Sequence, residues 1–185
     1  MKRLTLLTHN KKKLAEANRI ANSYGVLLVQ AGSAEKFEIQ SESLEEVSGL
    51  AARTAYRKLK RPLLVDDTGM FVKALSGFPG VYTAHAQYTI GNRGILKLMQ
   101  GKNDRSAYSA CALTFFDGRT FECFVGRMDG SILKSERGPR TFGFDPIFSP
   151  AGYSGRSLAE LSMDDKNRVS HRGKAFEAFF RWYSR

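Results

Sequence analysis

Two adjacent carboxylates follow a short apolar run near the middle of the chain. The run Leu63–Val65 leads directly into Asp66 and Asp67, which are followed by Thr68 and Gly69. The apolar residues predict a buried strand, and the glycine predicts a turn directly after it. Two acids at the carboxyl end of a core strand lie where open α/β sheets bind ligands, and carboxylate oxygens suit a hard cation. Because successive side chains of a strand point to opposite faces, one acid is expected to face a site and the other the framework. The alternative interpretation is an Asp-rich turn without chemistry.

A second polar segment joins a predicted strand to a predicted helix near the start of the chain. Its hydroxyl, amide and ammonium groups meet the positive end of the helix, a place that suits phosphate. The glycines of a Walker loop are missing, so an ordinary capped turn is the alternative. The segment consists of Thr8, His9, Asn10, Lys11, Lys12 and Lys13.

Two further segments in the last third of the chain carry groups that suit a nucleotide. Lys166 and Arg172 flank a short window that also holds His171, and arginine offers a planar fork for phosphate oxygens. Gly143-Phe144-Asp145-Pro146 combines an aromatic ring that can stack on a base with a carboxylate that accepts hydrogen bonds. A basic helix surface and a core phenylalanine in a tight turn are the respective alternatives.

The elements expected to position these groups alternate between strands and helices. The patterns predict strands at residues 3–8, 26–29, 63–65, 70–75, 106–116 and 120–125, and helices at 11–24, 44–60, 89–99 and after Gly173. Asp117-Gly118-Arg119 predicts a hairpin turn. The chain of 185 residues fits a single domain. The sequence therefore predicts a mixed α/β fold with an antiparallel part in its second half.

Composition limits the classes of partner. A net charge of +11 favours an anionic partner, which leaves nucleic acid, a membrane surface and a phosphorylated small molecule open. The usual nucleic-acid-binding motifs are missing, and neither a signal peptide nor a membrane span is recognised. Cys111 and Cys123 lie in strand-like segments, so they are expected to stay reduced in a cytoplasmic protein.

In their order and spacing, these segments together resemble the inosine triphosphate pyrophosphatase family over nearly the whole chain. The resemblance is carried by Thr8-x-Asn10-x-x-Lys13, Asp66-Asp67-Thr68-Gly69, Gly77-Phe78-Pro79-Gly80-Val81-Tyr82, Phe142-Gly143-Phe144-Asp145-Pro146-Ile147-Phe148, and Lys166-Asn167 followed by Ser170-His171-Arg172-Gly173. Thr89-Ile90-Gly91-Asn92 with Gly94-Ile95-Leu96-Lys97-Leu98-Met99 is similar to archaeal members.

The resemblance implies an elongated α/β fold whose central mixed sheet is flanked by helices. Residues 1–185 would then form one domain with two lobes and a substrate cleft between them. The implied reaction converts ITP, dITP or XTP and water to the monophosphate and pyrophosphate with Mg²⁺, which cleanses the nucleotide pool. It further implies a cytoplasmic homodimer that binds neither membrane nor stable nucleic acid.

The resemblance also implies a role for each matching residue. Asp67 would be the catalytic acid and a metal ligand, and Glu38, an isolated acid in a polar loop, would be the second metal ligand. Thr68 would contact the substrate through its hydroxyl. The phosphates would bind Thr8, His9, Asn10, Lys11, Lys12 and Lys13, the base would bind Phe142, Gly143, Phe144 and Asp145, and Lys166, His171 and Arg172 would complete the substrate site.

The chain departs from the family pattern at four positions. Lys12 and Thr141 stand where glycine is usual, Thr68 replaces serine, and Phe144 replaces a common tyrosine. Lys12 is expected to disturb the phosphate loop, because a residue with a side chain resists a positive φ.

Two rival functions remain. A septum-site-type pyrophosphatase with a different base specificity shares a similar fold, but the Ser170–Gly173 segment argues against it. A basic nucleic-acid-binding protein without turnover is supported only by the net charge of +11.

Overall fold

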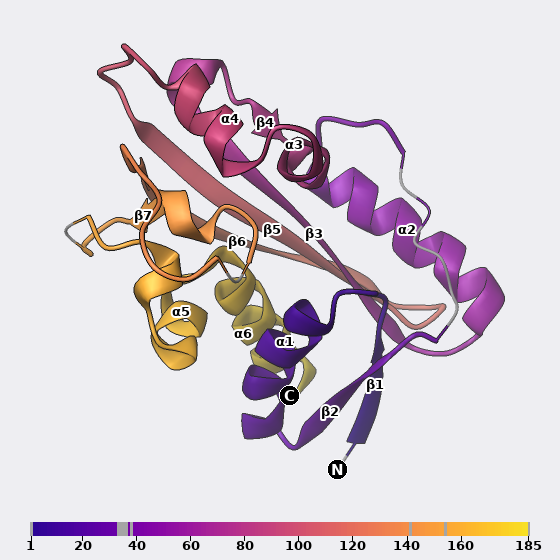
Figure 1. The fold of residues 1–185 in the computed structure, drawn as a ribbon. Helices are drawn as coiled ribbons and strands as arrows, with labels where there is room; N and C mark the ends of the chain where they lie inside the picture. The colour runs from indigo at the N-terminus through magenta and orange to yellow at the C-terminus, as the bar shows by residue number, and fades with distance from the viewer. Residues whose placement is uncertain (1, 33–36, 38, 141, 154, 185) are drawn as a thin grey trace.

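The computed structural model describes residues 2–32, 37, 39–140, 142–153 and 155–184. The strands of the described residues form one mixed sheet in the order β2-β1-β3-β5-β6-β7, with β4 also paired to β3 (Figure 1). Strands β2, β1 and β3 are parallel, whereas β3, β5, β6 and β7 are antiparallel. The strands are β1 Lys2–Leu6, β2 Val26–Gln30, β3 Leu63–Val72, β4 Pro79–Gly80, β5 Ser106–Phe116, β6 Phe121–Ile132 and β7 Phe148–Pro150.

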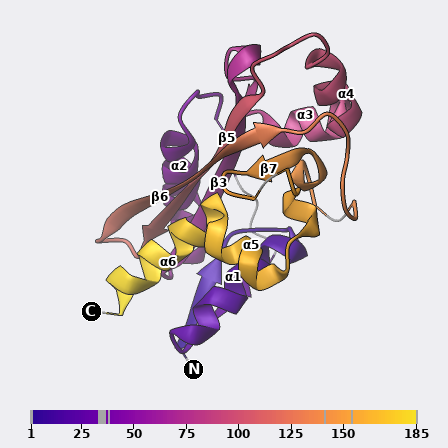
Figure 2. The same cartoon turned by 90° about the vertical axis from the view of Figure 1, so that its left-hand side faces the viewer.

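Helices cover both faces of this sheet, so the predicted mixed α/β fold is confirmed. α1 and α6 lie on one face and α2 on the other, as two views of the ribbon show (Figures 1 and 2). Phe176 and Phe179 of α6 pack with Leu64, while Ala51 of α2 packs with Val65. The helices are α1 Lys11–Ser23, α2 Leu44–Leu59, α3 Thr83–Thr89, α4 Gly91–Leu98, α5 Met163–Val169 and α6 His171–Tyr183. None of the described helices is both long enough and apolar enough to span a bilayer.

Strand β3 is longer than the sequence predicted, and the turn expected at Gly69 is wrong. The strand continues through Gly69 to Val72, and a 3-10 turn follows at Lys73–Leu75, so no separate strand covers residues 70–75. A Cβ atom on Gly69 would lie 2.7 Å from the carbonyl oxygen of Gly80. Glycine is therefore explained here by the close approach of β4 rather than by a turn.

The two carboxylates consequently lie inside a strand, at a gap along one of its edges. On that edge β3 pairs with β1 at Leu63 and Leu64, and with β4 at Met70 and Phe71. Among the described residues no strand pairs with residues 65–69 along this edge. The acids thus follow the part of β3 that pairs with β1, but the prediction that they lie at the carboxyl end of the strand is wrong.

Other predicted boundaries need smaller corrections. The helix predicted at residues 89–99 is confirmed as α4, although it begins at Gly91, where φ is +59°, and ends at Leu98. The short helix α3 that precedes it was not predicted. The last helix begins at His171 rather than after Gly173, because the Ser170 hydroxyl accepts the Gly173 amide and caps it. The predicted hairpin is confirmed, and the Asp117 carboxylate accepts the amides of Arg119 and Thr120 in its turn.

Candidate functional site

The segment predicted to bind phosphate forms a capped start of α1. The Asn10 side-chain oxygen accepts the amides of Lys12 and Lys13 at 3.0 and 3.2 Å, and the Thr8 hydroxyl accepts the Asn10 amide at 3.1 Å. Lys12 lies within the regular helix without a positive φ, so the expected disturbance of the loop is wrong. The capped turn that the sequence left as an alternative is present, and it aims the positive end of α1 at the gap.

Lys13 turns from this helix toward β3 and meets a buried acid. Its Nζ lies 3.1 Å from Oδ2 of Asp66, whose side chain is only 1% exposed. The Nε of Arg172, at the start of α6, lies 3.3 Å from the same oxygen. Asp66 is therefore the acid that faces the interior, where it forms ion pairs with one cation from α1 and one from α6.

Glu16 extends this contact into a larger arrangement. One carboxylate oxygen of Glu16 lies 2.6 Å from Lys166 Nζ, and the other lies 2.7 Å from Arg172 Nη1. Lys166 Nζ also lies 2.5 Å from Asp145 Oδ2. We call the set of Lys13, Asp66, Arg172, Glu16, Lys166 and Asp145 the central charge network.

The central charge network balances three cations against three carboxylates. Burial raises the pKa of Asp145, although the Lys166 ammonium opposes that shift. Burial also disfavours the charged form of Arg172, yet Asp66 and Glu16 raise its pKa above the usual value. Buried charges are tolerated when each has a partner at hydrogen-bonding distance. The network thus brings Lys13, Lys166, Arg172 and Asp145 together from four separate elements.

Sequence reasoning missed Glu16, although a local signal was present. Glu16 follows Lys13 by three residues on a predicted helix, so both side chains lie on the same face of α1. Glu16 is buried, which is unusual for an acid unless it is paired. The local signal was an acid three residues after a candidate phosphate-binding lysine on the same predicted helix.

Asp67 projects to the opposite face of β3 from Asp66. Val65, on the Asp67 side, packs with α2, and Ala112, which pairs with Asp67 across the sheet, packs with Leu44 at the start of α2. Asp67 is only partly buried. The side chains of Asp66 and Asp67 therefore point to opposite faces of β3, as strand geometry predicts. Asp67 is the more exposed of the two acids.

The aromatic segment lies beside the central charge network. Lys166 Nζ and Arg172 Cζ are 4.7 and 5.4 Å from the centre of the Phe142 ring, within reach of a cation–π contact. Gly143 adopts a φ of +46°, and Phe144 is buried in a core cluster that includes Met70. Phe142 is therefore the partly exposed ring of this segment, and Phe144 lies in the core.

A cavity of about 60 Å³ lies between β3, the Phe142 segment and α6. Thr68, Phe142 and His171 are among its lining residues. This volume holds a few water molecules at most and is too small for a purine base. A base that stacks on Phe142 must therefore use space outside this cavity.

His171 is held neutral at the edge of the charge network. Its pKa is lowered well below the ordinary value, first by burial and then by the neighbouring charges of Arg172 and Lys166. Its Nδ1 is buried and has no hydrogen-bond partner among the described residues. A neutral imidazole at this place can accept or donate one hydrogen bond.

The lowered pKa of His171 predicts a loss of stability in mild acid. Below about pH 6.5 the unfolded chain binds a proton that the folded chain does not, so the unfolding free energy falls as the pH falls, by up to about 1.4 kcal/mol per pH unit. We expect His171→Gln to flatten this dependence between pH 7 and 5 in urea unfolding followed by circular dichroism. His85→Gln, at an exposed position on α3, is the matched control. An unchanged slope in His171→Gln would contradict the assignment.

The structure does not describe two positions that the sequence singled out, a predicted metal ligand and a departure from the family pattern. Glu38 and Thr141 lie outside the described residues. Among the residues that the structure does describe, no three acidic, histidine or cysteine side chains gather as a metal cage. Mg²⁺ is commonly held by one or two carboxylates together with substrate phosphates, so the carboxylate of Asp67 at the gap fits the expected ion.

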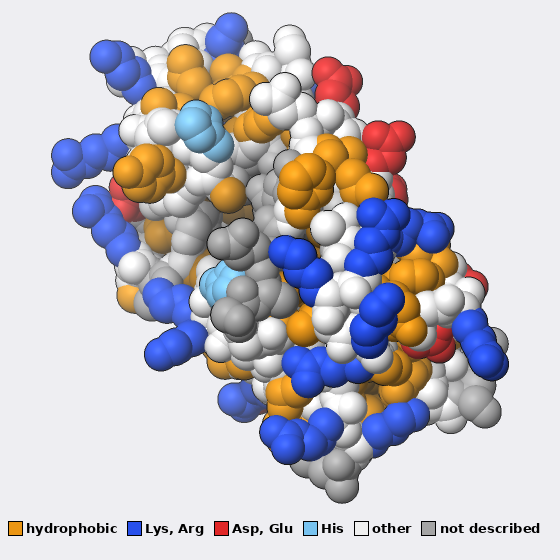
Figure 3. Space-filling view, turned by 90° about the vertical axis from the view of Figure 1, so that its right-hand side faces the viewer, with side chains coloured by type: hydrophobic (Ala, Val, Ile, Leu, Met, Phe, Trp, Pro, Cys, Tyr) orange, Lys and Arg blue, Asp and Glu red, His pale blue; other side chains and the backbone are white. Residues whose placement is uncertain are grey.

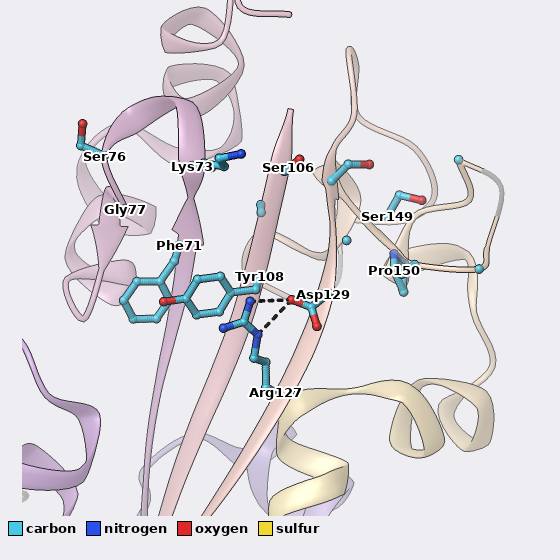
Figure 4. Close-up of a pocket in the computed structure, with 16 residues that line it drawn as sticks. Phe71, Lys73, Ser76, Gly77, Ser106, Tyr108, Arg127, Asp129, Ser149 and Pro150 are labelled. Atoms are coloured by element: carbon cyan, nitrogen blue, oxygen red, sulfur yellow. Dashed lines mark hydrogen bonds and ion pairs between the residues drawn. The ribbon is translucent and has the colours of Figure 1, made fainter. Parts of the chain in front are cut away.

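A cavity of about 830 Å³ lies away from these residues (Figure 4). Phe71 and Tyr108 stack there with ring centres 4.7 Å apart, and Arg127 lies 3.8 Å above the Tyr108 ring while pairing with Asp129. The Phe71 ring and the Arg127 guanidinium group thus both stack on the Tyr108 ring. None of the predicted site residues lines the cavity, so its size alone does not make it the candidate active site.

The space-filling view shows the shape and charge of one face of the molecule (Figure 3). One face of the molecule is hollowed between an upper and a lower part, and Lys and Arg side chains gather over the lower part. On this face, Lys and Arg side chains thus lie near a concave place, where positive charge raises the local concentration of anions.

Comparison with known proteins gives consistent matches along the chain. A profile of the Ham1 family matches residues 4–182. The dITP/XTP pyrophosphatase of Saccharolobus solfataricus is 49% identical over 96% of this chain and 91% of its own length. The dITP/XTP pyrophosphatase of Thermococcus kodakarensis is 43% identical, with 97% and 96% covered. The solved structure of a HAM1 protein from Coxiella burnetii superposes with a TM-score of 0.84 at 26% identity, covering 100% of this chain and 99% of the other.

Proposed function

The chain belongs to the Ham1 family, and from that premise we propose that it hydrolyses non-standard purine nucleoside triphosphates. The substrates are ITP, dITP and XTP, and the products are the nucleoside monophosphate and pyrophosphate. The observation that carries the proposal is the similarity to relatives named dITP/XTP pyrophosphatase, which covers 96% of this chain at 49% identity. The protein is accordingly an enzyme that acts on a phosphoanhydride bond.

The chemistry assigns different tasks to the two faces of β3. Asp67, the partly exposed acid at the gap, takes the proton from the attacking water as a general base. Lys13 at the start of α1 attracts the phosphates, together with Thr8, His9, Asn10, Lys11 and Lys12. Lys166 and Arg172 offset negative charge that grows in the transition state, from positions fixed by their carboxylate partners.

We propose Mg²⁺ as the cofactor, held by Asp67 and Glu38. The donor set supports this choice, because carboxylate oxygens and phosphate oxygens are the ligands that Mg²⁺ prefers. When bound, the ion neutralises phosphate oxygens and lowers the pKa of water. Thr68, one residue beyond Asp67 and on the other face, lines the cavity beside Phe142 and contacts the substrate through its hydroxyl.

Base selection rests on hydrogen bonding at position 6. Hypoxanthine and xanthine carry an oxo group where adenine carries an amine. A site that donates to the oxo group leaves its donor unpaired against the amine, and such a mismatch in a buried site discriminates strongly. Phe142, Gly143, Phe144 and Asp145 would form the base-binding segment, with His171 beside it.

The remaining assignments follow from the family resemblance. We propose a cytoplasmic homodimer whose anionic partner is a small nucleotide. A stable complex with nucleic acid is disfavoured, because the adjacent acids Asp66 and Asp67 would repel a phosphate backbone.

Identification of the products tests the proposed reaction. We expect ITP and XTP with Mg²⁺ to yield the monophosphate and pyrophosphate, because the anhydride bond between the α- and β-phosphates is the one hydrolysed. ATP should be a poor substrate, because its 6-amine leaves the donor of the site unpaired. The products are separated by anion-exchange chromatography and identified by ³¹P NMR. Release of orthophosphate with a nucleoside diphosphate would contradict the reaction type. Preference for a pyrimidine triphosphate would favour the septum-site-type rival, and salt-sensitive binding of oligonucleotides without turnover would favour a nucleic-acid-binding protein.

A further inference from the structure

The gap along the edge of β3 ends at a side-chain hydroxyl. At its first end the contact is between backbone groups, since the Leu64 carbonyl accepts the Leu7 amide at 2.8 Å. At its other end Oγ1 of Thr83 accepts the Met70 amide at 2.7 Å. Asp67, the proposed general base, lies between these two contacts. Thr83, which was not among the predicted site residues, therefore closes the gap in which that acid lies.

The Thr83 hydroxyl joins three elements of the fold. It accepts the amide of Met70 in β3 and donates to the carbonyl of Gly80 in β4 at 2.6 Å, while Thr83 itself is the first residue of α3. A hydroxyl has one proton to donate and lone pairs that accept, so both contacts are made at once with the proton directed at Gly80. We call these two hydrogen bonds the Thr83 clasp.

The Thr83 clasp sets how β4 lies against the end of the gap. The Gly80 carbonyl that it holds is the same group that leaves no room for a Cβ atom on Gly69. Without the hydroxyl, the Met70 amide and the Gly80 carbonyl lose these contacts and must pair with water or with another group. Either change displaces this edge of β3, whereas the opposite edge stays paired with β5 along its whole length.

We propose that Thr83 is a positioning residue that holds the Asp67–Thr68 segment in place for hydrolysis. The inference rests on the proposed function, because that function assigns the general base to Asp67. Thr83 also lines the 60 Å³ cavity together with Thr68 and His171, so the clasp lies at the wall of the candidate site. Thr83 acts on the reaction through β3, and a misplacement of about 1 Å in a reacting group can slow a reaction by about 10²-fold.

Thr83→Val tests the clasp, because valine keeps the size and branching of threonine but lacks the hydroxyl. We expect it to lower kcat for ITP by about tenfold or more through the displacement of Asp67. KM should change by no more than a few-fold, because the phosphate-binding segment at the start of α1 and the Phe142 segment lie on other elements. Thr83→Ser keeps the hydroxyl and should restore kcat. Thr89→Val is the matched control and should leave kcat unchanged, since the Thr89 hydroxyl of the same helix donates to the His85 carbonyl at 2.8 Å.

The separate effects on kcat and KM distinguish positioning from a purely structural role. A clasp that only stabilised the fold would lower the urea midpoint of Thr83→Val but would leave kcat of the folded protein unchanged. Activity is therefore measured without urea on protein whose folding is verified by circular dichroism. A kcat within a few-fold of the wild type in folded Thr83→Val, or an equal loss of kcat in Thr83→Ser, would overturn the proposal.

Hydrogen exchange of the Met70 amide tests the clasp without any substrate. By NMR, this amide should exchange slowly in the wild type, in Thr83→Ser and in Thr89→Val, and markedly faster in Thr83→Val. If the wild type hydrolyses ITP but Thr83→Val keeps both its kcat and the slow exchange, the positioning role fails and the proposed function stands. If the wild type hydrolyses no nucleoside triphosphate yet Thr83→Val releases the Met70 amide, the proposed function fails and the assignment of Thr83 as the residue that holds this segment stands.

Discussion

Asp67→Asn is expected to reduce kcat for ITP by ~10²–10⁴ or more, because asparagine neither accepts the proton of the attacking water nor carries the charge that holds a cation. The fold should persist, since Asp67 is only partly buried and asparagine has nearly the same shape. The measurement is pyrophosphate release from ITP, with circular dichroism to verify folding. Activity within a few-fold of the wild type would remove Asp67 from the mechanism.

The neighbouring acid provides a matched control. Asp66→Asn weakens the contacts to Lys13 and Arg172 inside the central charge network, so it should lower the unfolding free energy. Asp67→Asn should therefore affect activity far more than stability, and Asp66→Asn should have a marked effect on stability. Glu38→Gln should also reduce turnover, and excess Mg²⁺ should partly restore it if Glu38 only holds the ion.

Arg172→Met is expected to lower the unfolding free energy by about 3–5 kcal/mol, because it leaves Asp66 and Glu16 as buried carboxylates without their shared cation. Arg172 is 4% exposed, so water cannot replace the lost contacts without opening the core. The measurement is urea unfolding at neutral pH.

Arg168→Met is the control for this substitution. Arg168 pairs with Asp165 on the surface of α5, with its side chain 75% exposed, and such pairs contribute about 0–1 kcal/mol. If both variants lost a similar amount of stability, the central charge network would contribute no more than a surface pair. A double variant, Arg172→Met with Glu16→Gln, should recover part of the loss, because it also removes one of the stranded charges.

The sequence predicted those parts of the structure that depend on local patterns. The capped start of α1 after Thr8, the helix over α2 and the β5–β6 hairpin follow from turn residues and hydrophobic periodicity, and the structure has them. The division of Asp66 and Asp67 between two faces follows from strand geometry.

What the sequence could not predict depends on contacts between distant elements. Gly69 looked like a turn because its reason, the carbonyl of Gly80, lies on another strand. Glu16 meets Lys166 across 150 positions, so its spacing from Lys13 marks it as a candidate but does not identify this partner. Tertiary packing sets both contacts.

The gap along β3 has a consequence for self-association. An uncovered stretch of sheet edge exposes backbone groups that can pair with the strand of another molecule and start aggregation. Within the described part of the chain, residues 65–69 have no strand partner along this edge, and Asp67 and Thr68 are the partly exposed residues among them. Negative charge on an edge discourages a second strand from adding there. Asp67, which we propose as the general base, thus also opposes strand addition at the place where the sheet is incomplete.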